Sequence, residues 1–109
     1  MLGGIMTIFV QLGIYSNKGA DGIINGESDR KAAMEKMLSS VGAKLLEYHI
    51  TRGKYDFVLL SEANSFESVA ACALKAKASG TLSEAITLEA VDLNKVREMG
   101  RLVDFSPPK

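Results

Sequence analysis

The chain is poor in the residue types on which several kinds of functional site depend. Its 109 residues include one cysteine, Cys72, one histidine, His49, two prolines and no tryptophan. A single cysteine excludes an internal disulfide, and one histidine without paired cysteines leaves only oxygen ligands for a metal, with no spacing that selects a set. We therefore expect no metal site and no cofactor. Cys72 should be a buried, unreactive thiol, because a reactive thiol needs exposure and a lowered pKa.

An excess of charge of either sign is also lacking. Thirteen basic residues balance thirteen acidic ones, so no overall field attracts nucleic acid or acidic partners. Residues 1–17 carry no charge, but no basic segment precedes them and Gln11 and three glycines interrupt the apolar run. This pattern disfavours a signal peptide or a membrane span. The sequence thus predicts a cytoplasmic protein without nucleic-acid or membrane partners.

Length and composition are those of one ordinary domain. Apolar residues make up 47% of the chain and charged residues 24%. We expect a single domain over 1–109, with a folded core at about 6–99 and flexible extensions at 1–5 and 100–109. Met1 and Met6 both remain candidates for the native start.

Residues 45–62 read as a β-hairpin whose loop contains Gly53. A loop of two residues, Gly53-Lys54, and a loop of four, 51–54, both give the hairpin one apolar face, because residues opposite each other share a face. The longer loop sets His49 opposite Asp56, and the shorter one sets Thr51 there. The expected apolar face consists of Leu46, Tyr48, Ile50, Tyr55, Phe57 and Leu59. The mixed second face, where we expect any functional site, carries Leu45, Glu47, His49, Thr51, Asp56, Val58, Leu60 and Glu62.

The other elements are arranged around this hairpin. Apolar–polar alternation predicts strands over 6–15 and 82–91. Capping residues and helical spacing predict three helices, each ended by a glycine: Gly42, Gly80 and Gly100. They cover 29–41, a stretch from the cap in Asn64–Glu67 to about 79, and 93–99. Ser28 or Asp29 is the expected cap of the first. The glycine-rich residues 16–27 read as a loop and lack the Gly-Lys-Ser/Thr ending of a phosphate-binding loop.

This order, β-α-β-β-α-β with a short final helix, predicts an α+β fold of the ferredoxin-like type. Such a domain has a four-stranded antiparallel sheet with two helices on one face. Here the first and third strands are apolar on both faces, as Ile8-Phe9-Val10 and Phe57–Leu60 show. The face without helices would expose a larger apolar patch than monomers tolerate. We therefore expect a homodimer or higher homo-oligomer, formed through the sheet face, with no folded monomer at micromolar concentration.

The hairpin also resembles a known family. Gly53-Lys54-Tyr55-Asp56-Phe57-Val58 is similar to the Gly-x-Tyr-Asp-Phe-Val segment of the GYD-domain proteins. The resemblance extends over residues 7–99 and includes Ser16–Gly19, Arg30, Val41–Leu45, Thr51 and Glu62-Ala63. It implies a dimeric α/β barrel, in which two ferredoxin-like sheets pack face to face. It implies no particular activity, because fold does not fix function.

The candidate ligand-binding residues lie on the hairpin: His49, Thr51, Tyr55, Asp56 and Glu62. A carboxylate beside an imidazole orients the ring and raises its basicity, so His49 with Asp56, Glu47 or Glu62 is a candidate acid–base pair. The competing interpretation is structural: a neighbour satisfies His49, and Asp56 binds loop backbone. No catalytic residue is assigned.

Three functions follow from this pattern. The first is a small-molecule-binding homo-oligomer, which by analogy with other small dimeric α/β-barrel proteins extends to a cofactor-free enzyme. The second is a non-catalytic regulatory or structural assembly subunit. The third, an RNA-recognition-like domain, shares the order of elements and a Gly–aromatic–Phe-Val segment. It is disfavoured, because Lys54 intrudes between Gly53 and Tyr55 and Asp56 would repel phosphate.

Overall fold

The structure is a computed structural model that describes residues 6–27 and 29–108. Its elements, in chain order, are β1 (Thr7–Tyr15), α1 (Asn17–Ile24), α2 (Arg30–Ser39), β2 (Lys44–Ile50), β3 (Phe57–Ala63), α3 (Phe66–Ala78), β4 (Leu82–Glu89) and α4 (Leu93–Leu102). The strands form one antiparallel sheet in the order β2-β3-β1-β4. The predicted ferredoxin-like fold is confirmed. The extension expected at 1–5, with the choice between Met1 and Met6, and Ser28 as a helix cap lie outside the described residues.

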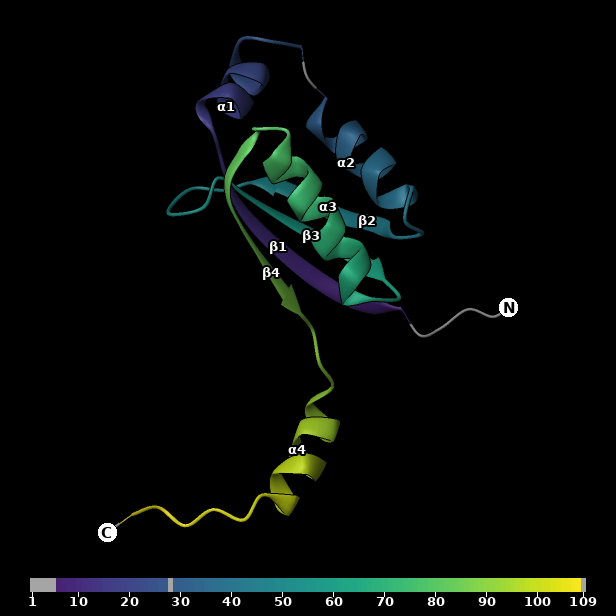
Figure 1. The fold of residues 1–109 in the computed structure, drawn as a ribbon, viewed down its shortest axis with the longest axis vertical. Helices are drawn as coiled ribbons and strands as arrows, with labels where there is room; N and C mark the ends of the chain where they lie inside the picture. Colours follow the sequence, from purple (N-terminus) through teal and green to yellow (C-terminus); the bar gives the residue numbers. More distant parts are fainter. Residues whose placement is uncertain (1–5, 28, 109) are drawn as a thin grey trace.

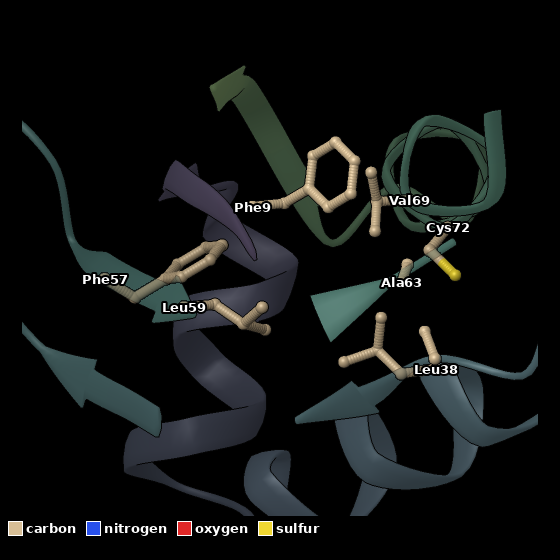
Figure 2. Close-up of a cluster of buried hydrophobic side chains, with 8 residues drawn as sticks. Phe9, Leu38, Phe57, Leu59, Ala63, Val69 and Cys72 are labelled. Atoms are coloured by element: carbon tan, nitrogen blue, oxygen red, sulfur yellow. The ribbon is translucent and has the colours of Figure 1, made fainter. Parts of the chain in front are cut away.

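Helices cover only one face of this sheet. Figure 1 shows α2 and α3 side by side on that face, α1 beyond the sheet's end, and α4 on an arm that leaves the end of β4. The central strands β1 and β3 turn Phe9, Phe57 and Leu59 toward the helices, where all three are buried. Leu38 of α2 and Val69 and Cys72 of α3 complete the core from the other side, as Figure 2 shows. The predicted burial of Cys72 is confirmed, and this burial raises the pKa of its thiol.

The helix boundaries follow from local chemistry. Asp29 caps α2 by accepting a hydrogen bond from the Ala32 N–H at 3.0 Å, and Ser65 caps α3 by accepting from the Ser68 N–H at 3.2 Å. Gly42 and Gly80, with φ of 75° and 84°, follow these helices in the left-handed conformation that was predicted to end them. These observed ends lie within two residues of the predicted ones.

The prediction of a loop over 16–27 was wrong, because residues 17–24 form α1. Ser16 caps this helix by accepting a hydrogen bond from the Gly19 N–H at 3.1 Å, and the Ser16 N–H donates to the Thr81 carbonyl at 3.0 Å. Gly19 is buried against that carbonyl: a Cβ at Gly19 would lie 2.2 Å from the Thr81 oxygen. The glycine that suggested a loop therefore permits close packing, and this tertiary contact overrides the low helix propensity of the segment.

The hairpin has the register predicted for the shorter loop, although β2 ends at Ile50 and β3 begins only at Phe57. His49 lies opposite Val58, and the Thr51 N–H donates to the Asp56 carbonyl at 2.8 Å, so Thr51 rather than His49 faces Asp56. The faces of β2 were predicted wrongly at its start. Leu45 pairs with Ser61 and Glu47 with Leu60, so Leu46 is the extra residue of a β-bulge. The bulge turns Leu45 toward the core and leaves Leu46 exposed.

The last helix was predicted to stop before Gly100 but continues to Leu102. A glycine ends a helix when it takes a positive φ, and among the described glycines only Gly42, Gly53 and Gly80 do so. Gly100 keeps helical geometry, so the chain becomes irregular only after Leu102. No helix among residues 6–27 and 29–108 has the length and hydropathy that a bilayer span requires.

We predict that Gly13→Ala lowers the free energy of unfolding by about 1–3 kcal/mol, the usual cost of overpacking a core. A Cβ at Gly13 would lie 2.3 Å from the ring of buried Phe57. Urea unfolding of Gly13→Ala, Phe57→Leu and the double variant measures the effect. The double variant should lose less than the sum of the two single losses, because leucine makes room for the new methyl group. Full additivity would contradict this contact.

Candidate functional site

A cleft lies between α2, α3 and the helix-covered face of the sheet. It has a volume of about 300 Å³, at the lower end of the range for small-molecule sites. Its floor comes from β1, β3 and β4, and its walls come from the two helices. The lining is mostly apolar and includes Tyr15, Ala33, Met34, Met37, Phe57, Leu59, Ala73, Ala76 and Leu82, with Arg30, Gln11, Lys75, Ser79 and Thr81 as polar members.

Small side chains on α3 explain why this space is open. Ala73 and Ala76 face the cleft, where larger residues would fill it, and Met34 and Met37 of α2 are half-buried on the opposite wall. Methionine is flexible and polarisable, so such a wall adapts to ligands of different shape. Alanines and methionines at helical spacing usually pack a core. The structure gives them a second role as the lining of the cleft.

Arg30 brings a positive charge to the cleft. It is the first residue of α2, and its Nη2 donates to the Gly19 carbonyl of α1 at 3.4 Å while its guanidinium carbon lies 5.9 Å from the centre of the Tyr15 ring. Its Nε atom is buried without a hydrogen-bond partner. Among residues 6–27 and 29–108, no carboxylate forms an ion pair with it. α1 thus positions a cation whose hydrogen-bonding capacity is only partly used.

Tyr15 supplies a hydroxyl group at the same place. Its Oη lies 2.7 Å from Oη of Tyr48, and its ring is tilted against that of Phe57 with 5.0 Å between centroids. Burial, and next the hydrogen bond with Tyr48, raise the pKa of Tyr15 far above its ordinary value of 10.0. Tyr15 therefore stays protonated at neutral pH and serves as a hydrogen-bond donor or acceptor rather than as a base.

Two of the hairpin residues that were predicted to bind a ligand instead form hydrogen bonds with backbone groups. The Asp56 carboxylate accepts a hydrogen bond from the Tyr15 N–H at 2.9 Å, and the Asp56 N–H donates to the Gly13 carbonyl at 2.8 Å. The Thr51 hydroxyl donates to the Tyr55 carbonyl at 2.6 Å. These bonds tie the hairpin loop to itself and to the end of β1. They also place Asp56 behind Tyr15, so the hairpin supports one residue of the cleft.

The remaining hairpin residues are separated from the cleft. His49 lies on the sheet face without helices, with its Nε2 2.9 Å from Oε1 of Glu47, and both side chains are more than half exposed. Tyr55 has the Lys54 ammonium 5.5 Å from its ring centre. Glu62 lies opposite Lys44 and Ile8, near the end of β3. The structure therefore does not bring His49 and Asp56 together as one pair.

Sequence reasoning missed the cleft itself. Arg30 was noticed only through the family resemblance, and Tyr15 only as one residue of an alternating strand. The available signal was a tyrosine at the end of the first strand, an arginine opening the next helix and alanines on a later helix. Their convergence depends on α1, which was read as a loop. In the described part of the chain, no group of three or more His, Cys, Asp or Glu residues is placed to hold a metal ion.

Comparison with solved structures gives neighbours of low sequence identity. The structure of FFRP-DM1 is 16% identical over 78% of this chain and 99% of that one, with a TM-score of 0.50, which supports the fold alone. Hypothetical protein PHS023 from Pyrococcus horikoshii is 14% identical over 80% and 90%, with a TM-score of 0.47. An uncharacterized NIPSNAP-like domain protein from Burkholderia xenovorans is 16% identical over 94% and 90%, with a TM-score of 0.48.

Sequence comparisons place the chain more specifically. No curated protein shows a significant match to it. The model of the GYD domain matches residues 9–99, a stretch that runs from β1 into α4 and includes the cleft. The Gly-Lys-Tyr-Asp-Phe-Val segment lies at the start of β3, where Asp56 and Phe57 support Tyr15. The chain therefore belongs to the GYD-domain family, within the dimeric α/β-barrel superfamily of ferredoxin-like folds.

Proposed function

We propose that the protein binds a small molecule with an apolar body and an anionic oxygen group in the cleft between α2, α3 and the sheet. The observation that carries the proposal is Arg30: its Nε is buried at this cleft without an acceptor, and its charge has no carboxylate partner in the described residues. A hydrogen bond between the charged guanidinium group and a ligand oxygen would contribute about 1.5–3 kcal/mol. Carboxylate and phosphate oxygens match the guanidinium group best.

The rest of the lining fits the same kind of ligand. Met34, Met37 and Phe57 offer apolar contact, and Tyr15 keeps its proton and adds a hydroxyl donor. Cys72, the one thiol, has a raised pKa and so stays protonated. Carboxylates and histidine are missing from the described lining residues, and these are the commonest general bases. The cleft is therefore better suited to binding than to acid–base catalysis.

A competing location for the ligand is the hairpin, with the predicted residues His49, Thr51, Tyr55, Asp56 and Glu62. Asp56 and Thr51 use their side chains on backbone groups, and His49 uses its ring on Glu47. These contacts leave fewer free polar groups there than at the cleft, and for this reason we place the ligand at the cleft.

We predict that Arg30→Met weakens binding of 2-naphthoate at least tenfold, which corresponds to about 1.4 kcal/mol, because it removes the charged group and keeps an unbranched apolar stem. Isothermal titration with 2-naphthoate and with its neutral analogue 2-naphthalenemethanol measures the effect. The neutral compound should bind both variants alike.

Two matched variants identify the site. Lys75→Met removes another cation from the cleft lining, and His49→Ala removes the histidine of the hairpin. His49→Ala should bind 2-naphthoate like the unaltered protein, and Lys75→Met should lose less affinity than Arg30→Met. A loss with His49→Ala and none with Arg30→Met would move the site to the hairpin, and absence of binding by the unaltered protein would overturn the proposal for this class of ligand.

The environment of Tyr15 generates a second prediction, about stability at alkaline pH. The unfolded chain releases the Tyr15 proton near pH 10, whereas the folded chain keeps it because its pKa is raised. The contribution of Tyr15 to the free energy of unfolding should therefore not change with pH below pH 10. Above pH 10 it should fall, by up to about 1.4 kcal/mol per pH unit. Urea unfolding between pH 8 and pH 11 should show a shallower fall for Tyr15→Phe than for the unaltered chain. Equal slopes would contradict the burial of this hydroxyl.

We also propose that the functional unit is a homodimer joined through the sheet face that the helices leave uncovered. We call this surface the open face; its apolar residues are Ile8, Val10, Leu12, Val58, Leu60, Ile86 and Leu88. Ile8 is 44% and Leu88 50% exposed in the single chain. A contiguous apolar patch of this kind is typical of an interface. This surface also favours the second candidate function, an assembly subunit.

We predict that Leu88→Glu dissociates the dimer, because it places a charge on the open face. Sedimentation velocity at micromolar concentration should show a species of twice 11.7 kDa for the unaltered chain and of 11.7 kDa for this variant. Leu74→Glu is the matched control, since Leu74 is 66% exposed on α3, away from the sheet. If the unaltered chain sediments as a compact monomer, or if both variants stay dimeric, the open face is not the interface.

A further inference from the structure

The C-terminal arm, residues 90–108, extends away from the body of the protein. Every described residue from Leu88 to Pro108 is exposed, and Figure 1 shows α4 well separated from the sheet and the other helices. The bond from the Ala90 N–H to the Ile8 carbonyl, at 2.9 Å, is the last backbone link to β1. Asp92 then begins α4 from an extended backbone, with φ of −76° and ψ of 120°. The linker between β4 and α4 thus leads outward and does not turn back onto the chain's own sheet.

α4 is amphipathic although nothing covers it. One side of the helix is apolar at helical spacing and carries Leu93, Val96, Met99 and Val103. The opposite side carries Asn94, Glu98 and Arg101, and Lys95 borders the apolar side next to Met99. Val96 and Met99 are 51% and 63% exposed. An isolated helix of this length is marginal in water, and packing of the apolar side normally stabilises it. The apolar side of α4 therefore needs a partner surface.

The exposed area of the chain is of the size that association with a second copy would bury. The chain exposes 7730 Å² and has a radius of gyration of 17.2 Å. A compact monomer of 11.7 kDa would expose about 5,900 Å², and a compact chain of 109 residues would have a radius of about 13 Å. The excess is therefore about 1,800 Å² per chain, or about 3,600 Å² for two. Obligate homodimers bury about 2,000–5,000 Å².

Charge complementarity indicates where the arm lies on that copy. Charges balance over the described arm, with Asp92, Glu98 and Asp104 against three basic residues. Within α4 itself the basic residues Lys95, Arg97 and Arg101 outnumber Glu98, so the positive charge is concentrated on the helix. The margin of the open face is acidic instead: it holds Glu47 on edge strand β2, Glu84 on edge strand β4 and Glu62 near the end of β3, with Lys44 as its one lysine. Leu46, exposed by the β-bulge, lies at the same margin.

We propose that the two chains of the dimer exchange their arms: α4 of each chain packs its apolar side on the margin of the open face of a second copy. This inference rests on the proposed homodimer and goes beyond it, since contact between the two sheets does not require exchange of the arms. A two-fold axis makes the exchange reciprocal, so both arms are covered and no open chain of subunits forms.

Matched substitutions on α4 test the exchange. Val96→Asp and Asn94→Asp add the same charge to opposite sides of one helix. Val96→Asp should raise the dimer dissociation constant at least tenfold in sedimentation equilibrium, and Asn94→Asp should change it less than threefold. Equal effects of the two variants, in a chain that still dimerises, would overturn the arm exchange and leave the contact between sheets intact.

Photo-cross-linking distinguishes exchange from an arm folded onto its own chain. A benzophenone maleimide attached to Val96→Cys should join two chains covalently, giving a denatured species of twice 11.7 kDa. The same label on Asn94→Cys should do so far less, and buried Cys72 should not react in the unaltered chain. Cross-links confined to single chains would show that the arm belongs to its own body. A chain found to be monomeric would overturn both this inference and the proposed homodimer, whereas 2-naphthoate binding tests the cleft independently.

Discussion

The two-sided apolar character of the sheet is the constraint on which the rest of the structure depends. β1 lies between β3 and β4 and presents buried Phe9 to the helices and half-buried Val10 to the opposite side. Two helices cover one side of a four-stranded sheet, so the molecule has an internal core, a cleft within that core and an uncovered surface. Each feature proposed here as functional lies at one of these places. The cleft forms where the cover on the helical side is incomplete, and the proposed interface lies where the cover is missing.

Most of the fold could be predicted because its signals are local. Alternation gave the strands, Asp29 gave the start of α2, and Gly42 and Gly80 gave the helix ends. The errors arose where distant residues decide the local structure. α1 exists because Gly19 lies against the Thr81 carbonyl, a contact across 62 positions that no local pattern reveals. The bulge at Leu46 likewise depends on how β2 aligns with β3.

The candidate site likewise depends on contacts between residues that are distant in sequence. The hairpin was predicted to hold the site because it contains the one histidine and a carboxylate. In the structure the Asp56 carboxylate accepts a hydrogen bond from the Tyr15 N–H, and His49 lies on the open face. Arg30 and Tyr15 belong to elements that are distant from the hairpin in sequence. They meet because α1 supplies the Gly19 carbonyl for the guanidinium group and because Asp56 fixes the end of β1. The sequence contained all these residues but not their proximity.

The exposed stretch from Leu88 to Pro108 has a consequence for the chain before assembly. Before it meets a second copy, a chain of the proposed dimer presents Leu93, Val96, Met99 and Phe105 on an uncovered segment. Proteases and chaperones recognise such segments, so a solitary chain would be open to degradation, and the proposed exchange of arms would protect it. The cellular level of the protein would then rise more steeply than its rate of synthesis, because each additional chain shortens the time that another spends alone.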